Sequence, residues 1–277
     1  MDNRRWLLRI ALTLLLTCVV SVCFAQRWRH RRRPQSLDDY RQMEGIPSWQ
    51  NEDGFTQDTF TFARVRYSST WGGGGWQVDY PDSDLNFSLR LQQLTSMKVN
   101  PDPVIVRLTD ENLGDFPFLY MIEPGGIELF PDEIEGLRRY CLNGGFMMVD
   151  DFWGDREYAR FYGEIKRVFP DREVEELPIS HEIFHNVYDL DEKPQIPSIG
   201  WVYDGNEWEV RKGPSAREVH FRAIKDDDGR IMVLICHNTD LGDGWEREGE
   251  NHEYFQKFSV KKAYPMGINI VTYAMTH

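Results

Sequence analysis

The sequence contains little cysteine, and the arrangement of the few cysteines present excludes common cysteine-based sites. Two of the four, Cys18 and Cys23, lie near the N-terminus, which leaves Cys141 and Cys236 in the rest of the chain. No CxxC pair or zinc-ribbon spacing occurs. Both remaining cysteines have the apolar neighbours that are typical of buried, inert thiols, and nothing indicates that they form a disulfide.

Basic residues are also in short supply. Asp and Glu number 45 against 32 Lys and Arg, so the formal net charge is −13. A surface this acidic repels phosphate backbones, which argues against nucleic-acid binding. Such an excess more often keeps a protein soluble than marks a cationic partner. The hydrophobic content of 41% and the aromatic content of 13% are sufficient for a large buried core.

Long apolar runs are absent except at the N-terminus. Arg4 and Arg5 precede the mostly apolar residues 7–22, and Ala25 supplies a small residue for a cleavage site. This order is typical of a secretory signal peptide over residues 1–25, so we expect export to the periplasm or the extracellular space. The apolar run contains an arginine and is too short for a comfortable membrane span.

Five arginines follow within residues 27–33. Such a cluster fits the cytoplasmic flank of an uncleaved anchor, which is the alternative to cleavage. It could equally contact anionic lipid headgroups from outside, as a membrane-surface arm. A lipoprotein anchor at Cys23 is a further alternative, although Val22 before it is larger than the residue that processing favours. Removal of residues 1–25, with three Arg and one Asp, would bring the net charge to −15.

The rest of the chain is interpreted as a basic and polar linker, residues 26–54, and a single domain, residues 55–277. Apolar runs predict strands at 60–67, 104–108, 118–122 and 146–149, and apolar periodicity predicts helices that begin near residues 82, 131 and 155. Buried-looking strands that alternate with helices indicate an α/β fold with a mostly parallel sheet covered on both faces, a three-layer α/β/α architecture.

The C-terminal half predicts an added β-hairpin region. Residues 201–210 contain the turn sequence Asp-Gly-Asn and are expected to form one hairpin. Residues 219–224 are expected to pair with residues 231–236 across a second turn, and residues 267–275 suit a closing helix.

Several segments carry recognisable motifs: FARVRY at 62–67, DLNF from 84 with LT at 94–95, FLYM at 118–121, EIEGLRRYCLNGGFMMVDD at 133–151, residues 177–190, and HNTD at 237–240. In these segments, which span roughly residues 60–277, the chain resembles a bacterial family, the domain of unknown function 4159. The stretch from 133 to 151 is the most specific of them.

That family is similar in architecture to class I glutamine amidotransferases and to trehalose-utilisation-type domains, so the resemblance implies an amidotransferase-like (flavodoxin-like) fold. In those proteins, the strand after a helix ending in Gly-Gly carries the functional residue at its carboxyl end. Asp150 and Asp151 occupy this position here. Because no cysteine stands there, and Cys141 lies inside the preceding helix, the resemblance does not imply a glutaminase reaction.

Ligands of open α/β sheets bind beyond the carboxyl ends of the strands. We therefore expect a ligand-binding cleft around Glu123, Asp150, Asp151 and His181. Two adjacent carboxylates could orient sugar hydroxyls, hold a cation, or act as acid and base. The favoured interpretation is that they cap the following helix by accepting backbone N–H groups, since successive strand residues face opposite sides.

Trp71 and Trp76 flank four glycines and are further candidates for ligand binding. The loop lacks the Lys-Ser/Thr ending of a phosphate-binding loop, so a phosphate cradle is not expected. The two indoles could stack on a sugar or an apolar ligand, or they could pack into the core.

Residues 181–185 spell HExxH. On a helix, His181 and His185 would lie one turn apart and could bind zinc, with Glu182 as the general base. Pro178 stands where that helix should already be established, and no third ligand is evident. No metal or cofactor is therefore expected, and a zinc site is the alternative.

The acidic residues 240–253 lack the alternating oxygen ligands of an EF-hand loop. We expect them to form a solvated loop, with a calcium site as the alternative.

These patterns favour a non-catalytic exported domain that binds an unidentified small molecule, carbohydrate or protein. A hydrolase that uses the same carboxylates, or a metal, is one alternative. A structural accessory of an envelope-associated complex is another, which the basic arm at residues 27–33 favours.

Overall fold

The computed structural model describes residues 36–51, 59–69 and 75–277, and the chain divides into two compact units, residues 1–46 and 47–277. The predicted signal peptide and basic arm lie outside the described residues.

The first unit contains one described helix, α2 (Leu37–Glu44), inside the segment expected to be a linker. The helix begins at Ser36, whose hydroxyl accepts a hydrogen bond from the N–H of Asp39 at 3.1 Å. It ends at Gly45, which adopts the left-handed conformation that commonly terminates a helix.

The second unit begins before the expected boundary at residue 55. Trp49 Nε1 and Asn51 Nδ2 both donate hydrogen bonds to the carbonyl of Val99, at 2.7 and 2.9 Å. These bonds attach the residues around 50 to the short strand β3 (Lys98–Val99), which pairs in parallel with β1 (Thr59–Phe60).

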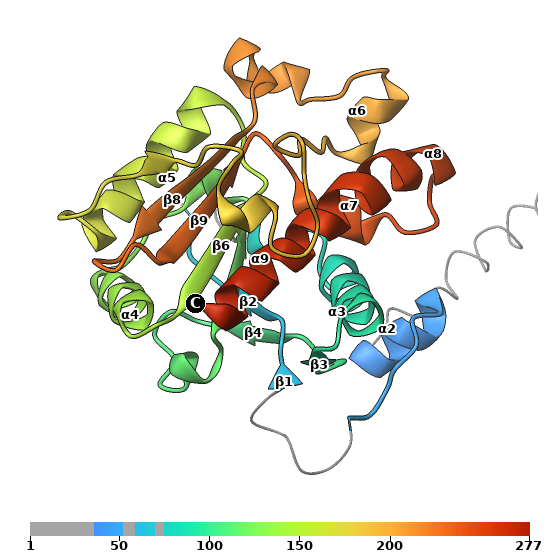
Figure 1. Cartoon of the computed structure of the whole chain (residues 1–277), viewed down its shortest axis with the longest axis horizontal. Coiled ribbons are helices and arrows are strands. Elements are labelled where there is room, and N and C mark those ends of the chain that lie inside the picture. Colours follow the sequence, from blue (N-terminus) through green and yellow to red (C-terminus); the bar gives the residue numbers. More distant parts are fainter. Residues whose placement is uncertain (1–35, 52–58, 70–74) are drawn as a thin grey trace, which may run out of the picture. The chain divides into compact units, whose positions relative to one another are not determined.

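A seven-stranded sheet in the order β4-β2-β5-β6-β9-β8-β7 forms the centre of the second unit (Figure 1). Its strands are β2 (Ala63–Val65), β4 (Val104–Val106), β5 (Phe118–Ile122), β6 (Phe146–Asp150), β7 (Glu175–Glu176), β8 (His220–Lys225) and β9 (Ile231–His237). The strands from β4 to β9 in this order are parallel. Strand β8 runs antiparallel to both β9 and β7.

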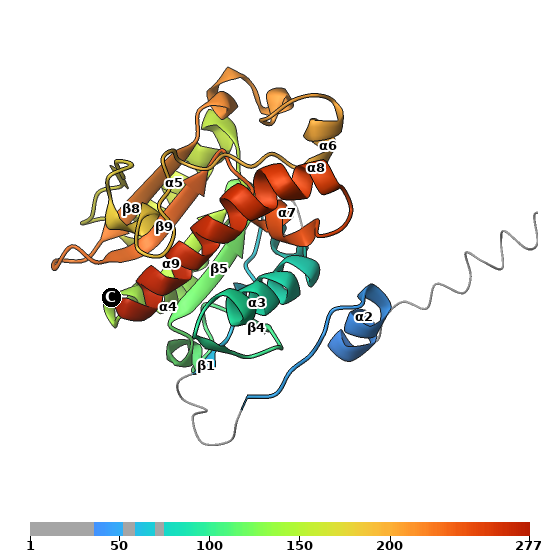
Figure 2. The ribbon, with the colours of Figure 1, turned by 45° about the vertical axis from the view of Figure 1, so that its right-hand side comes forward.

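Side chains of the central strands alternate between two buried clusters, one on each face of the sheet. Along β5, Leu119 and Met121 enter one cluster, while Phe118 and Tyr120 enter the other. Helices α4 (Pro131–Leu142) and α5 (Gly154–Val168) cover the first face, and α3 (Asp82–Leu94) and α9 (Tyr264–Thr276) cover the second (Figure 2). The predicted three-layer architecture with a mostly parallel sheet is therefore confirmed.

The strand predicted at residues 60–67 is two short strands in different sheets. Strand β1 ends at Phe60 and pairs with β3, whereas β2 begins at Ala63 and pairs with β4 and β5. The turn between them leaves Phe62 outside both strands, and its carbonyl accepts a hydrogen bond from the N–H of Val104 at 2.9 Å.

The hairpin predicted at residues 201–210 is wrong, whereas the second hairpin is confirmed as β8 and β9. The first segment forms the short helix α6 (Ile199–Tyr203) and a 3₁₀ turn, Val210–Lys212. Its backbone groups bond locally: the N–H of Gly205 donates to the carbonyl of Val202 at 2.9 Å. No ladder to a second strand forms in this segment, because the Asp-Gly-Asn turn ends a helix.

The solvated loop predicted at residues 240–253 is also wrong. Helices α7 (Leu241–Glu246) and α8 (His252–Tyr254) occupy most of it. Trp245 is fully buried, its ring lies 4.4 Å from that of Phe87, and its Nε1 donates to the carbonyl of Ala263 at 3.0 Å. The tryptophan thus anchors α7 against α3.

The closing helix is longer than predicted. A π-helical stretch, Phe255–Ala263, leads directly into α9. Within the described residues, none of the helices is long and apolar enough to cross a membrane.

Candidate functional site

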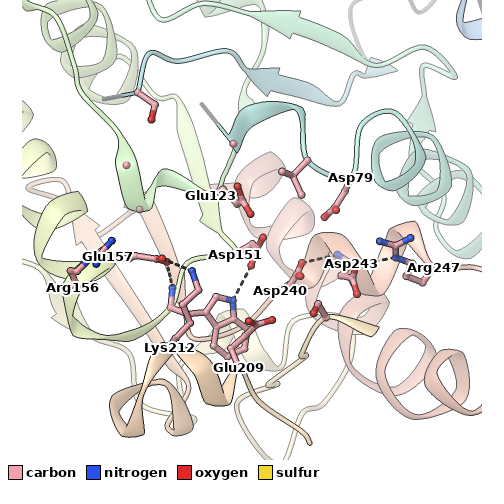
Figure 3. A pocket seen from close by; sticks show the side chains of 17 residues that line it. Asp79, Glu123, Asp151, Arg156, Glu157, Glu209, Lys212, Asp240, Asp243 and Arg247 are labelled. Carbon is pink, nitrogen blue, oxygen red and sulfur yellow. Dashed lines mark hydrogen bonds and ion pairs between the residues drawn. The ribbon is translucent and has the colours of Figure 1, made fainter. Parts of the chain in front are cut away.

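A pocket of about 620 Å³ lies at the carboxyl ends of β5 and β6, where the sequence predicted a cleft (Figure 3). Charged side chains dominate its lining. Seven are acidic, namely Asp79, Glu123, Asp151, Glu157, Glu209, Asp240 and Asp243, and three are basic, namely Arg156, Lys212 and Arg247. The excess of carboxylates gives the pocket a negative character.

Unusual backbone conformations concentrate around this pocket. In the described parts of the chain, the non-glycine residues with positive φ are Asp79, Glu123, Asp151 and Asn238, at 61°, 49°, 53° and 62°. The first three line the pocket. Left-handed conformations are costly for residues with a side chain, and they cluster at functional sites where the surrounding structure maintains them. In this protein, the three residues with left-handed backbones direct their carboxylates into one cavity.

Asp150, the last residue of β6, faces away from the pocket and stabilises the start of α7. Its Oδ2 accepts hydrogen bonds from Tyr120 Oη at 3.1 Å and from the backbone N–H groups of Leu241 and Gly242 at 2.9 and 3.1 Å. The capping interpretation is therefore correct for Asp150, although the helix is α7 across the sheet and not the following helix α5. Complete burial raises the pKa of Asp150 to about 7, against the opposite effect of these hydrogen bonds.

Asp151 follows β6 directly and lines the pocket, and its backbone is left-handed, with a φ of 53°. Its N–H donates to the carbonyl of Thr239 at 3.2 Å, and its Oδ1 accepts a hydrogen bond from Trp153 Nε1 at 2.9 Å. Burial, followed by the charge of Glu123, raises the pKa of Asp151 well above its usual range.

Glu123 follows β5 directly and lies beside the end of β6, because its N–H donates to the carbonyl of Asp150 at 3.0 Å. The side chain packs against Gly75, where an added Cβ would lie 2.1 Å from Glu123 Oε2. A glycine at 75 is therefore needed for the carboxylate to hold this position. Loss of solvent within the pocket raises the pKa of Glu123 to about 7, with Lys212 acting in the opposite direction and Glu157 adding to the rise.

Lys212 comes from the segment 210–218, which Asn238 and α5 hold in place. Asn238 Nδ2 donates to the carbonyls of Ser215 and Glu218 at 2.8 and 2.6 Å. The Lys212 ammonium group pairs with Glu157 of α5, as Figure 3 shows. One of the three basic groups of the pocket thus lies near Glu123 and Asp151.

The other end of the pocket holds Asp79 and Asp243 (Figure 3). Asp243 of α7 accepts hydrogen bonds from the N–H of Ile199 at 2.6 Å and from Arg247 Nε at 3.0 Å. Burial, followed by the charges of Glu246 and Asp243, raises the pKa of Asp79. Burial likewise raises the pKa of Glu246 to about 7, with Arg247 acting in the opposite direction.

The structure does not bring His181 into the pocket. The His181 ring lies 6.1 Å from that of Tyr273, whose hydroxyl accepts a hydrogen bond from the N–H of Ile231 at 3.1 Å. Ile231 begins β9, so His181 lies at the opposite edge of the sheet from Glu123 and Asp151. Its expected place in the cleft is wrong, because residues 177–190 cross to the amino ends of the parallel strands.

The helix required for the HExxH zinc alternative is absent. Residues Glu182–Phe184 form a single 3₁₀ turn, which His181 caps by accepting a hydrogen bond from the N–H of Ile183 at 3.2 Å. The two nitrogens of His185 contact Asp189 and the carbonyl of Ile179. Within 36–51, 59–69 and 75–277, neither histidine belongs to a group of three side chains that could share an ion.

Trp76 packs into the core, and Trp71 lies outside the described residues. Trp76 is only 7% exposed and shares a buried cluster with Val65 and Tyr67. The guanidinium of Arg66 lies 5.3 Å from its ring centroid. The indole therefore supports the pocket wall from behind and is not itself part of the lining.

Several lining residues were missed by sequence reasoning. Asp79 lies between the glycine loop and α3, where neither periodicity nor a motif marks it. The sequence predicts a solvated loop at Asp240 and Asp243, and Lys212 lies just beyond the hairpin predicted at residues 201–210. The rule that ligands gather at strand ends found Glu123 and Asp151 but could not show which distant segments cover those ends.

Fold and pocket together define the protein as a three-layer α/β domain with a carboxylate-lined pocket at the carboxyl edge of its sheet. The model of a protein family described as a domain of unknown function, DUF4159, matches residues 61–275. This match covers most of the chain, so the protein belongs to this family, as its motifs predicted. No curated protein matches the chain.

Proposed function

We propose that the protein is an exported, non-catalytic ligand-binding domain whose pocket takes a small polar molecule with a positive charge and several hydroxyl groups, such as an amino sugar. The observation that carries this proposal is the convergence of Asp79, Glu123 and Asp151, all in left-handed conformations, on one cavity. Backbone strain of this kind is retained where a site has to be kept in a set geometry.

Electrostatics favour a ligand that carries positive charge. Buried carboxylates are stable in the ionised form only when cations or hydrogen-bond donors compensate them. The pocket has seven carboxylates and three basic groups, and one of those basic groups, Lys212, already pairs with Glu157. A protonated amine would supply part of the missing charge, while ligand hydroxyls would donate hydrogen bonds to the remaining carboxylate oxygens.

A ligand-binding role without the glutaminase reaction agrees with the state of the cysteines. Cys141 and Cys236 are both free and fully buried, and burial raises the pKa of each thiol. Such thiols are poor nucleophiles. The amidotransferase-like origin of the fold and export through residues 1–25 are parts of the same proposal.

Thermal unfolding with three probes tests the proposal. Glucosamine carries charge and hydroxyls, glucose carries only hydroxyls, and 1,4-diaminobutane carries only charge. At about ten times its Kd, glucosamine should raise the Tm of the purified chain by roughly 3–6 °C. The variant with Glu123→Gln and Asp151→Asn should lose this shift, whereas Asp115→Asn, an exposed change just before β5, should retain it. If none of the three probes shifts the folded wild-type chain, the proposal fails.

A hydrolase remains the second candidate, because the pKa of Glu123, about 7, lies in the range of an effective general acid or base. In that case the chain would release nitrophenol from a panel of nitrophenyl glycosides or esters, with a pH profile that Glu123→Gln abolishes. Binding of glucosamine without turnover of any of these compounds would favour the binding domain.

A further inference from the structure

Three carboxylates gather beside the end of the pocket formed by α7, where Asp79 and Asp243 belong to the lining and Glu246 lies next to them. Asp79, Asp243 and Glu246 each offer one oxygen, and these oxygens lie within 4.8 Å of one another. Ligand oxygens of a Ca²⁺ ion lie about 2.3–2.6 Å from it, so two of them can be up to about 5 Å apart. The three oxygens can therefore reach one ion with little movement.

Asp79 supplies an observation that does not depend on the grouping of charges. Its Oδ2 is buried and has no hydrogen-bond partner among the described residues. Figure 3 shows its carboxylate directed toward Asp240 and Asp243. A Cβ at Gly242 would lie 2.6 Å from this oxygen, so the glycine permits the close approach of α7. An unpaired buried carboxylate oxygen is costly and calls for a ligand.

Arg64 holds Asp79 in this position. Arg64 Nη1 donates to the carbonyls of Trp76 and Val78, at 3.0 and 2.9 Å, and so fixes the backbone immediately before Asp79. The guanidinium also pairs with Asp84 in α3, with Nε donating to Oδ2 at 2.9 Å. The backbone of the Asp79 loop is thus tied to β2 on one side and, through Asp84, to α3 on the other.

The only basic side chain that contacts this group of carboxylates within the described residues is Arg247. Its Nε lies 3.0 Å from Asp243 Oδ1 and 2.7 Å from Glu246 Oε2. Its Nη1 also pairs with Glu250, at 3.2 Å. One guanidinium therefore pairs with Asp243, Glu246 and Glu250, while Asp79 Oδ2 has no hydrogen-bond partner among the described residues.

We infer that Asp79, Asp243 and Glu246 form a binding site for one hard divalent cation, Ca²⁺ in the first instance, in the wall of the ligand pocket. Three carboxylate oxygens with no nitrogen or sulfur ligand select Ca²⁺, Mg²⁺ or Mn²⁺ over zinc. This inference rests on the proposed function, because the cation would face the same cavity and ligand hydroxyls could complete its coordination. The proposed cation site differs from the prediction, made from the sequence, that the protein binds no metal.

Calorimetric titration of the chelator-treated full chain with CaCl₂, MgCl₂ and MnCl₂ separately tests the site. We expect one Ca²⁺ per chain and a higher Tm in its presence. Asp79→Asn should weaken Ca²⁺ binding by at least about tenfold, and Glu246→Gln should do so as well. Glu246 is only half-buried and is the better test if Asp79→Asn fails to fold. The control Asp115→Asn removes one exposed carboxylate and should bind Ca²⁺ as the wild type does.

Separate outcomes bear on the two proposals. A folded wild-type chain that binds none of the three cations overturns the cation site, and so does Ca²⁺ binding that survives both Asp79→Asn and Glu246→Gln. A chain that binds glucosamine but none of the three cations would leave the proposed function standing and overturn this inference. Ca²⁺ binding that Glu123→Gln leaves intact, with no response to any organic probe, would support the cation site and count against the proposed function.

Discussion

Arg64 and Asp84 form an ion pair from which solvent is fully excluded, in which Arg64 Nε donates to Asp84 Oδ2 at 2.9 Å. The pair joins strand β2, which lies next to the edge strand β4, to the first turn of α3. Arg64 Nη2 also donates a hydrogen bond to Ser83 Oγ at 2.9 Å, and Nη1 donates to the carbonyls of Trp76 and Val78. The ion pair thus connects the core of the domain to the loop that carries Asp79.

Loss of one partner of this ion pair should destabilise the domain strongly. Arg64→Met leaves the Asp84 carboxylate buried without its cation, which should lower the free energy of unfolding by about 3–5 kcal/mol. Urea unfolding measures the change. The double variant Arg64→Met with Asp84→Leu should recover a part of the loss, because it removes the uncompensated charge. A change below about 1 kcal/mol in the single variant would show that the pair does not support the fold.

Asp150 and Asp151 are adjacent, but substitution of Asp150 should lower stability strongly, whereas substitution of Asp151 should mainly weaken ligand binding. Asp150→Ala removes the acceptor of three buried donors at the start of α7 and should cost about 3 kcal/mol or more. Asp151→Asn keeps an acceptor for Trp153 and should change stability by less than about 1 kcal/mol while it weakens ligand binding. Chemical unfolding of the two variants side by side checks this, and equal losses of stability would contradict the separate roles.

Glu123 should make stability depend on pH. Its folded pKa of about 7 lies above its ordinary value of 4.5, so the folded state binds the proton more tightly than the unfolded state. The contribution is fully present below the ordinary value and is lost as the pH rises through about 7. Glu123→Gln should therefore match the wild type near pH 4 and exceed its stability near pH 8. Urea midpoints across this range provide the measurement, and a difference that is the same at every pH would be inconsistent with the raised pKa.

Export makes a prediction about the N-terminus. Cleavage after Ala25 would leave Gln26 as the first residue of the protein recovered from a secreting bacterial host. Intact-mass spectrometry of the recovered chain distinguishes this from an uncleaved anchor. A chain that retains Met1 and sediments with membranes would contradict cleavage and support the anchored alternative.

The layers of the fold could be predicted from sequence because the strands are continuous apolar runs. Strand β5 and the strand ending at Asp150 are buried on both faces, and the helices between them have apolar faces with clear boundaries. The prediction of a hairpin at residues 201–210 was wrong, because a turn sequence that can close a hairpin can also end a short helix. Which of the two forms depends on contacts with the rest of the domain.

Only a small part of the site could be predicted, and the reason lies in where its residues come from. Glu123 and Asp151 follow strands, so a general rule about parallel sheets places them together. Asp243 looked solvated because acidic residues are usually exposed, whereas here backbone and tyrosine donors compensate its burial. His181 was misplaced because no local pattern reveals to which edge of the sheet a long connection returns.

The most direct test of the proposed ligand pocket is a calorimetric titration of the purified chain with glucosamine. We expect saturable binding to one site per chain in the wild type and no measurable heat of binding in the folded variant with Glu123→Gln and Asp151→Asn. Binding of equal strength in the wild type and this variant would show that the carboxylates at the strand ends do not form the ligand site.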